Sequence, residues 1–443
     1  MTSVPTTNRV LLEHLSSIPC NSETSLEPYV KPSPRAVCGT GHLEPCEDAG
    51  MTQLDLSAIY RDLHQHPELA FTEHRTASVV AHALRDLGLT PRTGIGGTGV
   101  VADIVRGSGK VIALRADMDA LPILEQTGLA YSSQHDGIMH ACGHDAHTTM
   151  LLGAAQKLVQ SNFSGTVRLV FQPAEEGYGD DAARQSGAQK MLEAGVYDGV
   201  SAALALHNIP QIPLGQLGVC DAEIMGCCLD FRITVRGVSA HAGAEPERGV
   251  DAILIGSSIV VTAQSLVSRT LAALEAGIVS FGVMSGGKAE NIVADELILR
   301  GTIRTLKDSV AFHLRDRLEQ LASNVAAAHG GTTEFYADPL LPSTYNDPAV
   351  NAAMRVAAQD VGLELLEISA SLGVEDFAYV SHTVPSAYAM IGAGVVGTEQ
   401  YGLHHAQVRC NEDVLPLGAA LLAGVALRLL GGNAERRELI AES

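Results

Sequence analysis

The sequence contains no tryptophan and only ten tyrosines and eight phenylalanines among its 443 residues. This scarcity limits any aromatic substrate pocket without excluding one. Basic residues are also few, because 29 lysines and arginines stand against 50 acidic residues, which gives a formal net charge of −21. A chain this acidic is poorly suited to nucleic acid or to an anionic membrane surface, so we expect neither as the main partner.

Long apolar runs and a dense cysteine pattern are missing too. No stretch of about eighteen uninterrupted apolar residues occurs, which argues against a transmembrane helix. The N-terminus lacks the basic start and apolar core of a secretory signal. The eight cysteines are not spaced as a disulfide framework, and Cys227 and Cys228 are adjacent. Together these absences predict a cytoplasmic protein.

The apolar content of 46% is ample for two domains in a chain of this length. Residues 1–50 are rich in Pro, Ser, Thr and Glu and show no periodicity, so we expect a disordered leader, with Met51 as a possible true start. Residues 51–89 predict two helices. Apolar strands are expected within 98–105, 109–123, 165–177 and 201–210, with a helix at 148–161. Strands that alternate with helices predict an open α/β sheet with its site at the strand ends.

A second pattern runs from 228 to 337, in the order strand, helix, strand, strand, helix, strand. This order predicts an inserted α+β sandwich, a lid or dimerisation domain. The catalytic domain is then expected to comprise 51–227 and 338–432, followed by a tail at 433–443.

The segment 139–149, MHACGHDAHTT, concentrates groups that bind metals or move protons. It holds His140, Cys142, His144 and His147, with Asp145 beside them. A thiol and several imidazoles so close together are costly if they are buried without partners, so a divalent cation is the expected partner. A polar loop with a chance histidine pair is the alternative.

Further candidate ligands follow other predicted strands. Glu175 and Glu176 end one strand and His207 ends another, while His404 or His405 comes from the C-terminal segment. The set Cys142, His144, Glu176, His207 and His404 is too large for one four-coordinate ion with an open position, and suits two ions that share a bridging ligand. Neighbouring residues of a strand point in opposite directions, so Glu176 could bind metal while Glu175 faces the substrate as general base. The acidic pair could also be an exposed turn.

The predicted inserted domain offers three more candidates. His241, within GVSAHAG, could donate a hydrogen bond to a tetrahedral oxyanion, with a core histidine as the alternative. Asn291 and Arg304 could hold a substrate carboxylate, although an arginine at a strand end is more often a surface group.

Nine segments, RADMDALP, MHACGHDAHT, FQPAEEG, ALHN, GVSAHAG, GGKAENIVADE, GTIRT, GVEDF and NEDVLPLGA, resemble the dinuclear metal-dependent amidohydrolases. The nearest branch comprises hippurate hydrolases, N-acyl-amino-acid amidohydrolases and auxin-conjugate hydrolases. The resemblance runs in order from about residue 55 to 430. It implies metal-dependent hydrolysis of the amide bond of an N-acyl amino acid, two divalent ions, manganese or zinc, and a homodimer or higher homo-oligomer.

The resemblance also assigns residues. It implies that the metal ligands are Cys142, His144, Glu176, His207 and His404, and that Glu175 is the general base. In related enzymes the histidine that matches His241 reaches an active site, often that of the partner subunit, and the resemblance implies the same for His241. Asp117 and Asp119 are expected to support the ligands. The family often shows His-His-Pro where this chain has His404, His405 and Ala406, which leaves the choice of ligand histidine open. A dipeptidase or carboxypeptidase is the alternative function, and a metal-binding protein without catalysis is a remote one.

Overall fold

The computed structural model describes residues 53–177, 179, 184–395, 397 and 399–431. The expected leader and the expected tail at 433–443 lie outside these residues. The two helices predicted between 51 and 89 are α1 (Leu56–Gln65) and α2 (His74–Asp86). Helix α1 begins after Asp55, whose carboxylate accepts a hydrogen bond from the backbone N–H of Ala58, the usual way to cap a helix.

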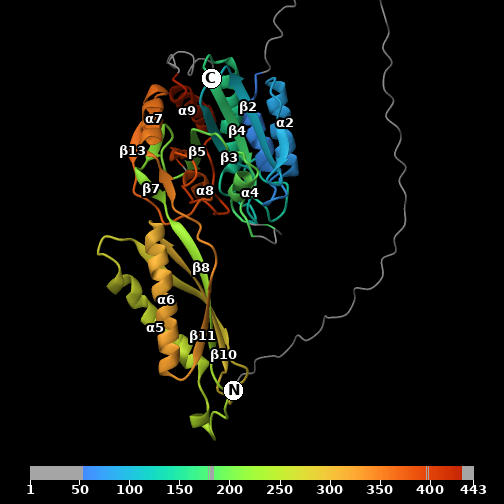
Figure 1. The fold of residues 1–443 in the computed structure, drawn as a ribbon. Helices are drawn as coiled ribbons and strands as arrows, with labels where there is room; N and C mark the ends of the chain where they lie inside the picture. The colour runs from blue at the N-terminus through green and yellow to red at the C-terminus, as the bar shows by residue number, and fades with distance from the viewer. Residues whose placement is uncertain (1–52, 178, 180–183, 396, 398, 432–443) are drawn as a thin grey trace, which may run out of the picture. The chain divides into compact units, whose positions relative to one another are not determined.

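An eight-stranded sheet in the order β1-β2-β4-β3-β5-β14-β6-β13 carries the metal-ligand candidates (Figure 1). Strand β3 is parallel to β4 and β5, β5 is parallel to β14, and β6 is parallel to β13, while the other neighbours are antiparallel. The predicted open mixed sheet is therefore confirmed. Its strands are β1 (Arg92–Ile95), β2 (Gly99–Arg106), β3 (Val111–Asp117), β4 (Gly165–Gln172), β5 (Ala202–Ile209), β6 (Gln216–Val219), β13 (Glu364–Glu367) and β14 (Ser386–Gly392).

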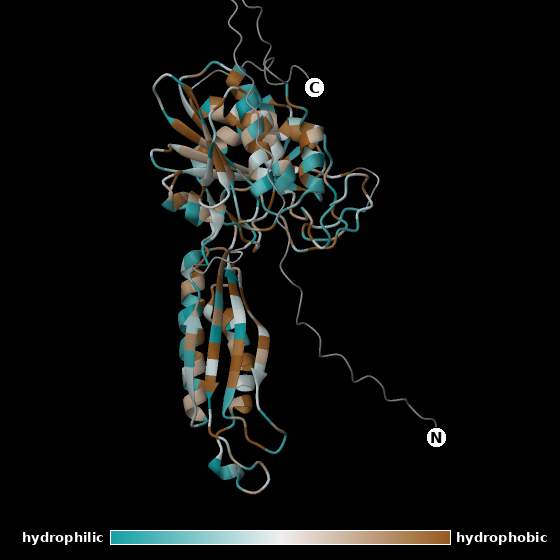
Figure 2. Cartoon of the chain, turned by 90° about the vertical axis from the view of Figure 1, so that its right-hand side faces the viewer, coloured by the Kyte–Doolittle hydropathy of each residue, from teal (hydrophilic) through white to brown (hydrophobic). Residues whose placement is uncertain are grey.

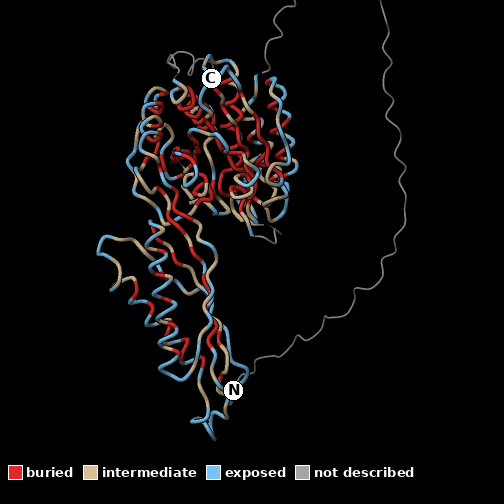
Figure 3. Tube along the Cα trace, viewed as in Figure 1, coloured by how far each residue is buried: buried red, intermediate tan, exposed pale blue. Residues whose placement is uncertain are grey.

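Alternation along the strands divides the buried apolar residues between the two faces of this sheet. On β5, Leu204 and Leu206 pack with one cluster, whereas Ala203 and Ala205 pack with the other. The first cluster includes α1 and α2 together with α3 (His144–Gln160), α7 (Pro348–Asp360) and α9 (Val414–Leu429). The second includes α4 (Gly187–Glu193) and α8 (Phe377–Ser381). Buried residues fill the strands and the helices against them (Figure 3).

A separate four-stranded antiparallel sheet, in the order β11-β8-β10-β9, packs against two helices. The observed sequence order is the one predicted: β8 (Cys227–Arg236), the short 3₁₀ helix η1 (Pro246–Arg248), α5 (Ala252–Thr270), β9 (Gly277–Gly286), β10 (Glu296–Thr305), α6 (Asp308–Ala328) and β11 (Thr332–Ala337). The expected α+β sandwich is thus present, and we call it the lid. A two-stranded sheet, β7 (Ala222–Met225) with β12 (Thr344–Asn346), lies outside it in the sequence. The boundaries assigned to the two domains stay a prediction.

Helix α5 is the one described helix that is long and apolar enough to cross a membrane by length and composition alone. Its Ile255, Ile259 and Leu266 are buried in the core of the lid, whereas Leu254 and Val261 are exposed. Figure 2 shows hydrophobic residues along the lid strands as well as on the helices. The helix therefore buries one face in the lid and leaves further apolar residues exposed to solvent.

Candidate metal centre

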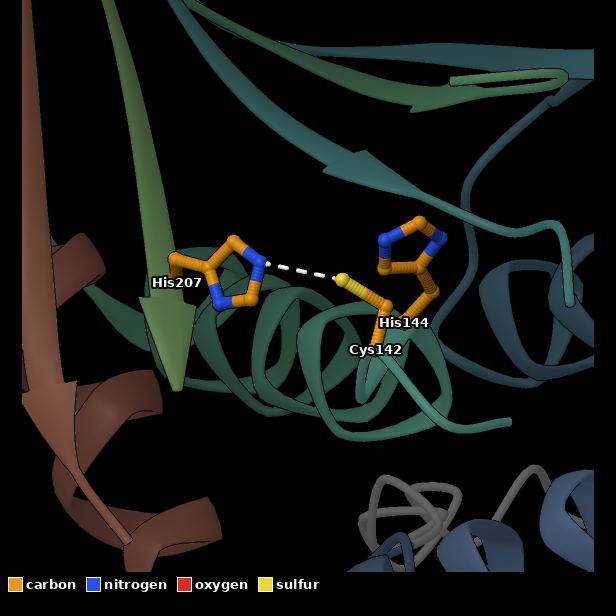
Figure 4. A group of neighbouring side chains, drawn as sticks. All are labelled: Cys142, His144 and His207. Carbon is orange, nitrogen blue, oxygen red and sulfur yellow. Dashed lines mark hydrogen bonds between the residues drawn. The ribbon is translucent and has the colours of Figure 1, made fainter. Parts of the chain in front are cut away.

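Cys142, His144 and His207 form the centre of the candidate site (Figure 4). The Cys142 sulfur lies 3.3 Å from Nε2 of His207, on β5, and His144 is the first residue of helix α3. Gly143, which lies between Cys142 and His144, has a φ of +90°, and a Cβ at this position would lie 2.2 Å from the Asn208 side chain. Only glycine combines this backbone with so close an approach, so the Cys-Gly-His spacing is fixed by the fold.

The two histidines reach the centre in different protonation states. Nδ1 of His207 donates to the carbonyl oxygen of Asn208 at 2.9 Å, which leaves Nε2 with its lone pair toward the sulfur. Burial lowers the pKa of His207 to about 3. Burial also lowers the pKa of His144, but the charges of Asp117 and Asp119 outweigh it and raise that pKa to about 10. The ring of the ligand candidate His207 is thus held neutral, while His144 lies in a strongly negative environment.

The two glutamates follow β4, which ends at Gln172, and are not part of the strand. Ala174 adopts a φ of +48° before them, and both carboxylates approach Nε2 of His144 to 3.9 Å. The expectation that strand alternation points Glu175 and Glu176 in opposite directions is therefore wrong, because a turn has replaced the strand. The turn brings both acids to the same histidine.

Two buried acids hold this turn. Asp119 accepts the backbone N–H of Glu175 at 3.1 Å and that of Glu176 at 2.9 Å, as well as Nδ1 of His144 at 3.1 Å. Glu73, before helix α2, accepts the N–H of Ala174 at 2.9 Å. Asp119 thus orients His144 and the backbone of both glutamates, and its role in supporting metal ligands stays a prediction. The sequence did not identify Glu73, since its contact spans about a hundred residues.

The loop after β14 separates the two neighbouring histidines. Nε2 of His404 lies 3.0 Å from Oε1 of Glu176, and the two residues group with Cys142. The ring of His405 instead stacks on Tyr401 with ring centroids 4.3 Å apart, and its Nδ1 accepts the N–H of Gln407. The geometry therefore places His404, with its φ of +65°, at the centre and directs His405 away from it.

The remaining members of the 139–149 cluster, His140, Asp145 and His147, differ in whether they have partners within the protein. His147 donates from Nδ1 to Asp117 at 2.6 Å and accepts the N–H of Asn208 at Nε2, at 3.0 Å, so both ring nitrogens are used within the protein. Asp145 bonds to His64 at 2.7 Å. His140 is buried, and neither of its ring nitrogens has a partner among the described residues. Asp117 accepts the hydrogen bond from His147, and its expected role in supporting the ligands stays a prediction.

Behind the glutamates lies a buried arginine that the sequence did not reveal. Arg115 donates to Asp117 at 2.6 Å and to Glu375 and Asp376 at 2.9 Å each. Motif GVEDF delivers the last two, but nothing local to it indicates a partner on β3. The second oxygen of Glu375 accepts the hydroxyl of Tyr388 at 2.6 Å, so these carboxylates are engaged rather than open to solvent.

The donor set fits divalent cations. Nε2 of His144 is buried without a hydrogen-bond partner among the described residues, and Oδ2 of Asp117 also lies 3.8 Å from it. Burial raises the pKa of the Cys142 thiol well above its ordinary value, and Glu176 and Glu175 raise it further. Imidazole, thiolate and carboxylate are the donors that zinc takes in proteins. The cluster therefore has an excess of negative charge and an unpaired ligand nitrogen, both of which a cation would satisfy.

The general-base candidate has the opposite tendency from its neighbour. Burial raises the pKa of Glu175 well above its ordinary value, helped by the charges of Glu375 and Glu176. Burial also raises the pKa of Glu176, but the hydrogen bond from His404 and the charge of His144 outweigh burial and lower that pKa. Two adjacent carboxylates with pKa values displaced in opposite directions suit a proton carrier beside a ligand.

The three lid candidates do not form one cluster. His241 and Ile292 are bridge partners and the N–H of Ala242 donates to the carbonyl of Asn291, so His241 and Asn291 lie together. Arg304 pairs with Cys228 near the other end of β10. At about 3.4 Å per strand residue, roughly 27 Å separates Arg304 from the Asn291 end. Asn291 and Arg304 of one chain therefore cannot hold the same carboxylate, contrary to the expectation.

Comparison with known proteins agrees with this site. Residues 113–428 match the sequence profile of peptidase family M20/M25/M40. The chain is 37% identical to N-acetyl-L-cysteine deacetylase of Bacillus subtilis, over 86% of this chain and 90% of that protein. It is 36% identical to an IAA-amino acid hydrolase of Arabidopsis thaliana (84% and 85%), and 35% identical to thermostable carboxypeptidase 1 of Saccharolobus solfataricus (82% and 93%).

A solved structure extends the likeness to three dimensions. A Bacillus subtilis protein described as a dinuclear metal-binding peptidase of family M20 superposes with a TM-score of 0.75 and is 34% identical. The match covers 85% of this chain and 97% of that one. The large mixed sheet and the lid are therefore shared with a protein described as binding two metals.

Proposed function

Because the chain belongs to peptidase family M20/M25/M40 and is a metal-dependent hydrolase acting on amides, we propose that it cleaves N-acyl amino acids to a carboxylate and a free amino acid. The observation that carries the proposal is the cluster in which Glu175 and Glu176 meet His144, with Cys142, His207 and His404 around it. A deacetylase and an amino-acid-conjugate hydrolase among the relatives support an amide with an acyl group on one side.

We assign Cys142, His144, Glu176, His207 and His404 as the residues that would hold two divalent cations, since their ligand atoms fall into overlapping groups around Cys142 and His144. When bound, such ions lower the pKa of water and polarise a carbonyl oxygen. A thiolate ligand favours zinc over manganese. Competition with a chelator tests this preference, and equal affinity for zinc and manganese would count against it.

Glu175 carries the proton. Its carboxylate accepts a proton from the attacking water and returns it to the amide nitrogen, so that the carbon–nitrogen bond breaks and the amine leaves neutral. The backbone N–H of Asp376 lies 3.4 Å from Oε1 of Glu175, and the Asp119 contacts fix the turn on the other side. A buried acid with a raised pKa holds a transferred proton more readily than an exposed one.

The lid contributes His241 and a contact between two copies of the chain. Nδ1 of His241 accepts the N–H of Gly243 at 3.2 Å and of Ala244 at 3.1 Å, so the neutral ring carries its hydrogen on Nε2, as an oxyanion donor requires. Strand β9 has no partner on its outer edge among the described strands. Val283 and Met284 on this strand are exposed. An apolar edge strand of this length favours pairing with a second copy.

In such a dimer the two separated carboxylate-binding candidates need not come from one chain. We propose that Arg304 acts with its own chain while His241 and Asn291 serve the other copy. Light scattering after chromatography should show a dimer, and Val283→Lys should shift it toward the monomer. A monomer with full activity would exclude any contribution of His241 from a partner.

The peptidase alternative requires an acidic partner for a free amino group. Glu375 and Asp376 line the cavity at the site, but their carboxylate oxygens already accept hydrogen bonds from Arg115, Tyr388, Gln172 and backbone N–H groups. A substrate whose nitrogen is an uncharged amide therefore fits this cavity better than one with a free ammonium group. The carboxypeptidase relative keeps a peptide substrate as the second candidate.

The decisive experiment measures metal content and hydrolysis before and after chelation. The panel comprises hippurate, N-acetyl amino acids, an indole-acetyl conjugate and two dipeptides. We expect two ions per chain and chelator-sensitive cleavage of an acyl amino acid. Glu175→Gln should keep the metal and lose turnover by about a hundredfold or more, the usual contribution of a general base. Full activity of that variant would end the proposal, and bound metal without turnover on any substrate would favour a non-catalytic protein.

The cysteines bear on the compartment. Cys142, Cys220, Cys227, Cys228 and Cys410 are all free thiols. A ligand thiol that must stay reduced is compatible with a reducing interior, and we propose that the enzyme acts in the cytoplasm.

A further inference from the structure

A cavity of about 630 Å³ adjoins the metal-ligand candidates. One side of it is polar and contains the ligands and Glu175. The other side is an apolar wall, formed by Ile209, Ile212, Met225, Ile368, Met390 and Leu403. Most of this wall belongs to the apolar cluster on the α4 and α8 face of the large sheet. The cavity is therefore a place where that cluster is left open beside the reactive groups.

Strand register places the wall directly beside a ligand. His207 on β5 pairs with Met390 on β14, and Met390 pairs with Gly218 on β6. Paired residues of neighbouring strands project to the same face of a sheet. At about 4.8 Å per strand, Gly218 lies roughly 10 Å from His207 along this row. A group bound at the cations thus meets Met390 first and the region of Gly218 further in.

Gly218 determines how far the wall recedes. Its φ lies outside the left-handed region, so its backbone does not require glycine. A Cβ at this position would lie 3.1 Å from Ile212 and from Ile368 and 3.2 Å from Met390, closer than side chains normally approach. All three neighbours belong to the wall. A side chain at 218 would therefore push the wall into the cavity.

The lining also decides which part of the substrate enters. No lysine or arginine lines the cavity among the described residues, while Glu175, Glu176, Glu375 and Asp376 do. The apolar wall therefore offers an amino-acid carboxylate no cationic side chain, so the uncharged acyl group is the part of the substrate that fits against it. Apart from histidines, Tyr379 is the one aromatic residue among the described residues of the lining, and two methionines make the wall adaptable.

We propose that this cavity binds a straight aliphatic acyl chain longer than acetyl, and that Gly218 sets the length it accepts. The proposal rests on the proposed amidase function and narrows its substrate class. The wall stabilises the chain by burying its methylene groups, and acetyl is too short to reach the residues over Gly218.

The test uses the metal-loaded enzyme and one amino acid carrying acetyl, butanoyl, hexanoyl, octanoyl or benzoyl groups. We expect kcat/KM for hexanoyl to exceed that for acetyl and benzoyl by about tenfold or more, the usual discrimination by apolar contacts. Gly218→Ala should lower kcat/KM for octanoyl and hexanoyl by about tenfold and leave acetyl within about twofold. Ile368→Ala, which enlarges the cavity, should favour octanoyl and keeps the test available if the glycine variant fails to fold.

Leu217→Val is the matched control, because Leu217 neighbours Gly218 but packs in the core on the opposite face of the sheet. It should lower stability without changing the order of acyl preference. Equal kcat/KM for acetyl, hexanoyl and benzoyl, unchanged by Gly218→Ala and Ile368→Ala, would overturn the inference and leave the amidase function intact.

Binding of free acetic, hexanoic and benzoic acids to the Glu175→Gln holoenzyme separates the two failures. Tight binding of hexanoic acid that Gly218→Ala weakens would support the cavity assignment even if no amide were hydrolysed, and would then refute only the function. Equal affinity for the three acids would refute the cavity assignment.

Discussion

Asp119→Asn is the substitution that tests most directly how the metal centre is built. The buried carboxylate accepts three hydrogen bonds, two at Oδ1 from His144 and the Glu175 N–H, and one at Oδ2 from the Glu176 N–H. An asparagine has one acceptor oxygen. If the asparagine oxygen takes the place of Oδ1, its NH2 group faces the Glu176 N–H, which then has no acceptor. If the oxygen takes the place of Oδ2, the NH2 group faces two donors, His144 and the Glu175 N–H.

The expected magnitude follows from that count. A buried donor left unpaired costs about 1–3 kcal/mol, and the lost charge weakens the remaining bonds. Because the affected groups are a ligand histidine and the turn carrying a ligand glutamate, we expect metal affinity and kcat/KM each to fall about tenfold to a hundredfold. Affinity is measured by competition with a chelator, and stability by denaturant unfolding of the metal-free protein.

Asp103→Asn provides the matched control. Asp103 on β2 pairs with Arg168 at 2.8 Å and is absent from the ligand groups. Its loss should affect stability modestly and metal affinity not at all. Asp119→Asn with metal affinity and kcat/KM within about twofold of the wild type would refute the idea that this carboxylate orients the ligands.

Three further outcomes are expected. Cation affinity should rise with pH between about 6 and 8, by about tenfold per pH unit for each proton displaced. The reason is that the raised pKa keeps the Cys142 thiol protonated until a cation displaces the proton. Isothermal titration at several pH values measures this affinity, and an affinity that does not change with pH would contradict the prediction. Burial and the charge of Asp119 raise the pKa of Glu73 to about 7, so its stabilisation is complete below about 4.5 and is lost as pH rises through 7. Glu73→Gln should abolish up to about 3 kcal/mol of that loss in denaturant unfolding, and an unchanged pH profile would contradict the shift. His404→Ala should reduce bound metal measured by elemental analysis, whereas His405→Ala should not, and the reverse result would reassign the ligand.

Much of the fold could be predicted because its signals are local. Apolar runs bounded by glycine or polar residues predicted four strands of the large sheet, β2, β3, β4 and β5, and the order of segments between 228 and 337 predicted the lid. Cys142 and His144 could be found because they lie within three residues. His207 and Glu176 could be found because polar residues at the ends of apolar strands are conspicuous.

Other parts depended on contacts that no local pattern records. The Asp119 carboxylate meets the Glu176 N–H across 57 residues, and Arg115 meets Asp376 across 261. The strand-alternation argument for the glutamates failed because β4 ends two residues before Ala174, whose positive φ changes the direction of the chain. The choice between His404 and His405 likewise depended on a backbone angle that the sequence pattern does not specify.

The buried acids of the site are only partly balanced by positive charge within the protein. Asp117 and Asp119 are buried, and Glu175 and Glu176 nearly so, around one imidazole, an arrangement that is costly unless positive charge offsets it. Arg115 offsets part of it from behind, since it bonds to Asp117 but contacts neither glutamate of the turn. The remaining acids, Glu175 and Glu176, line the cavity. Burial lowers the pKa of His144 beside them, but the charges of Asp117, Asp119 and Glu176 raise that pKa to about 10. Arg115 therefore balances the acids on one side, while the uncompensated acids on the cavity side favour the binding of a cation that we propose, and the apolar wall of the cavity carries no charge.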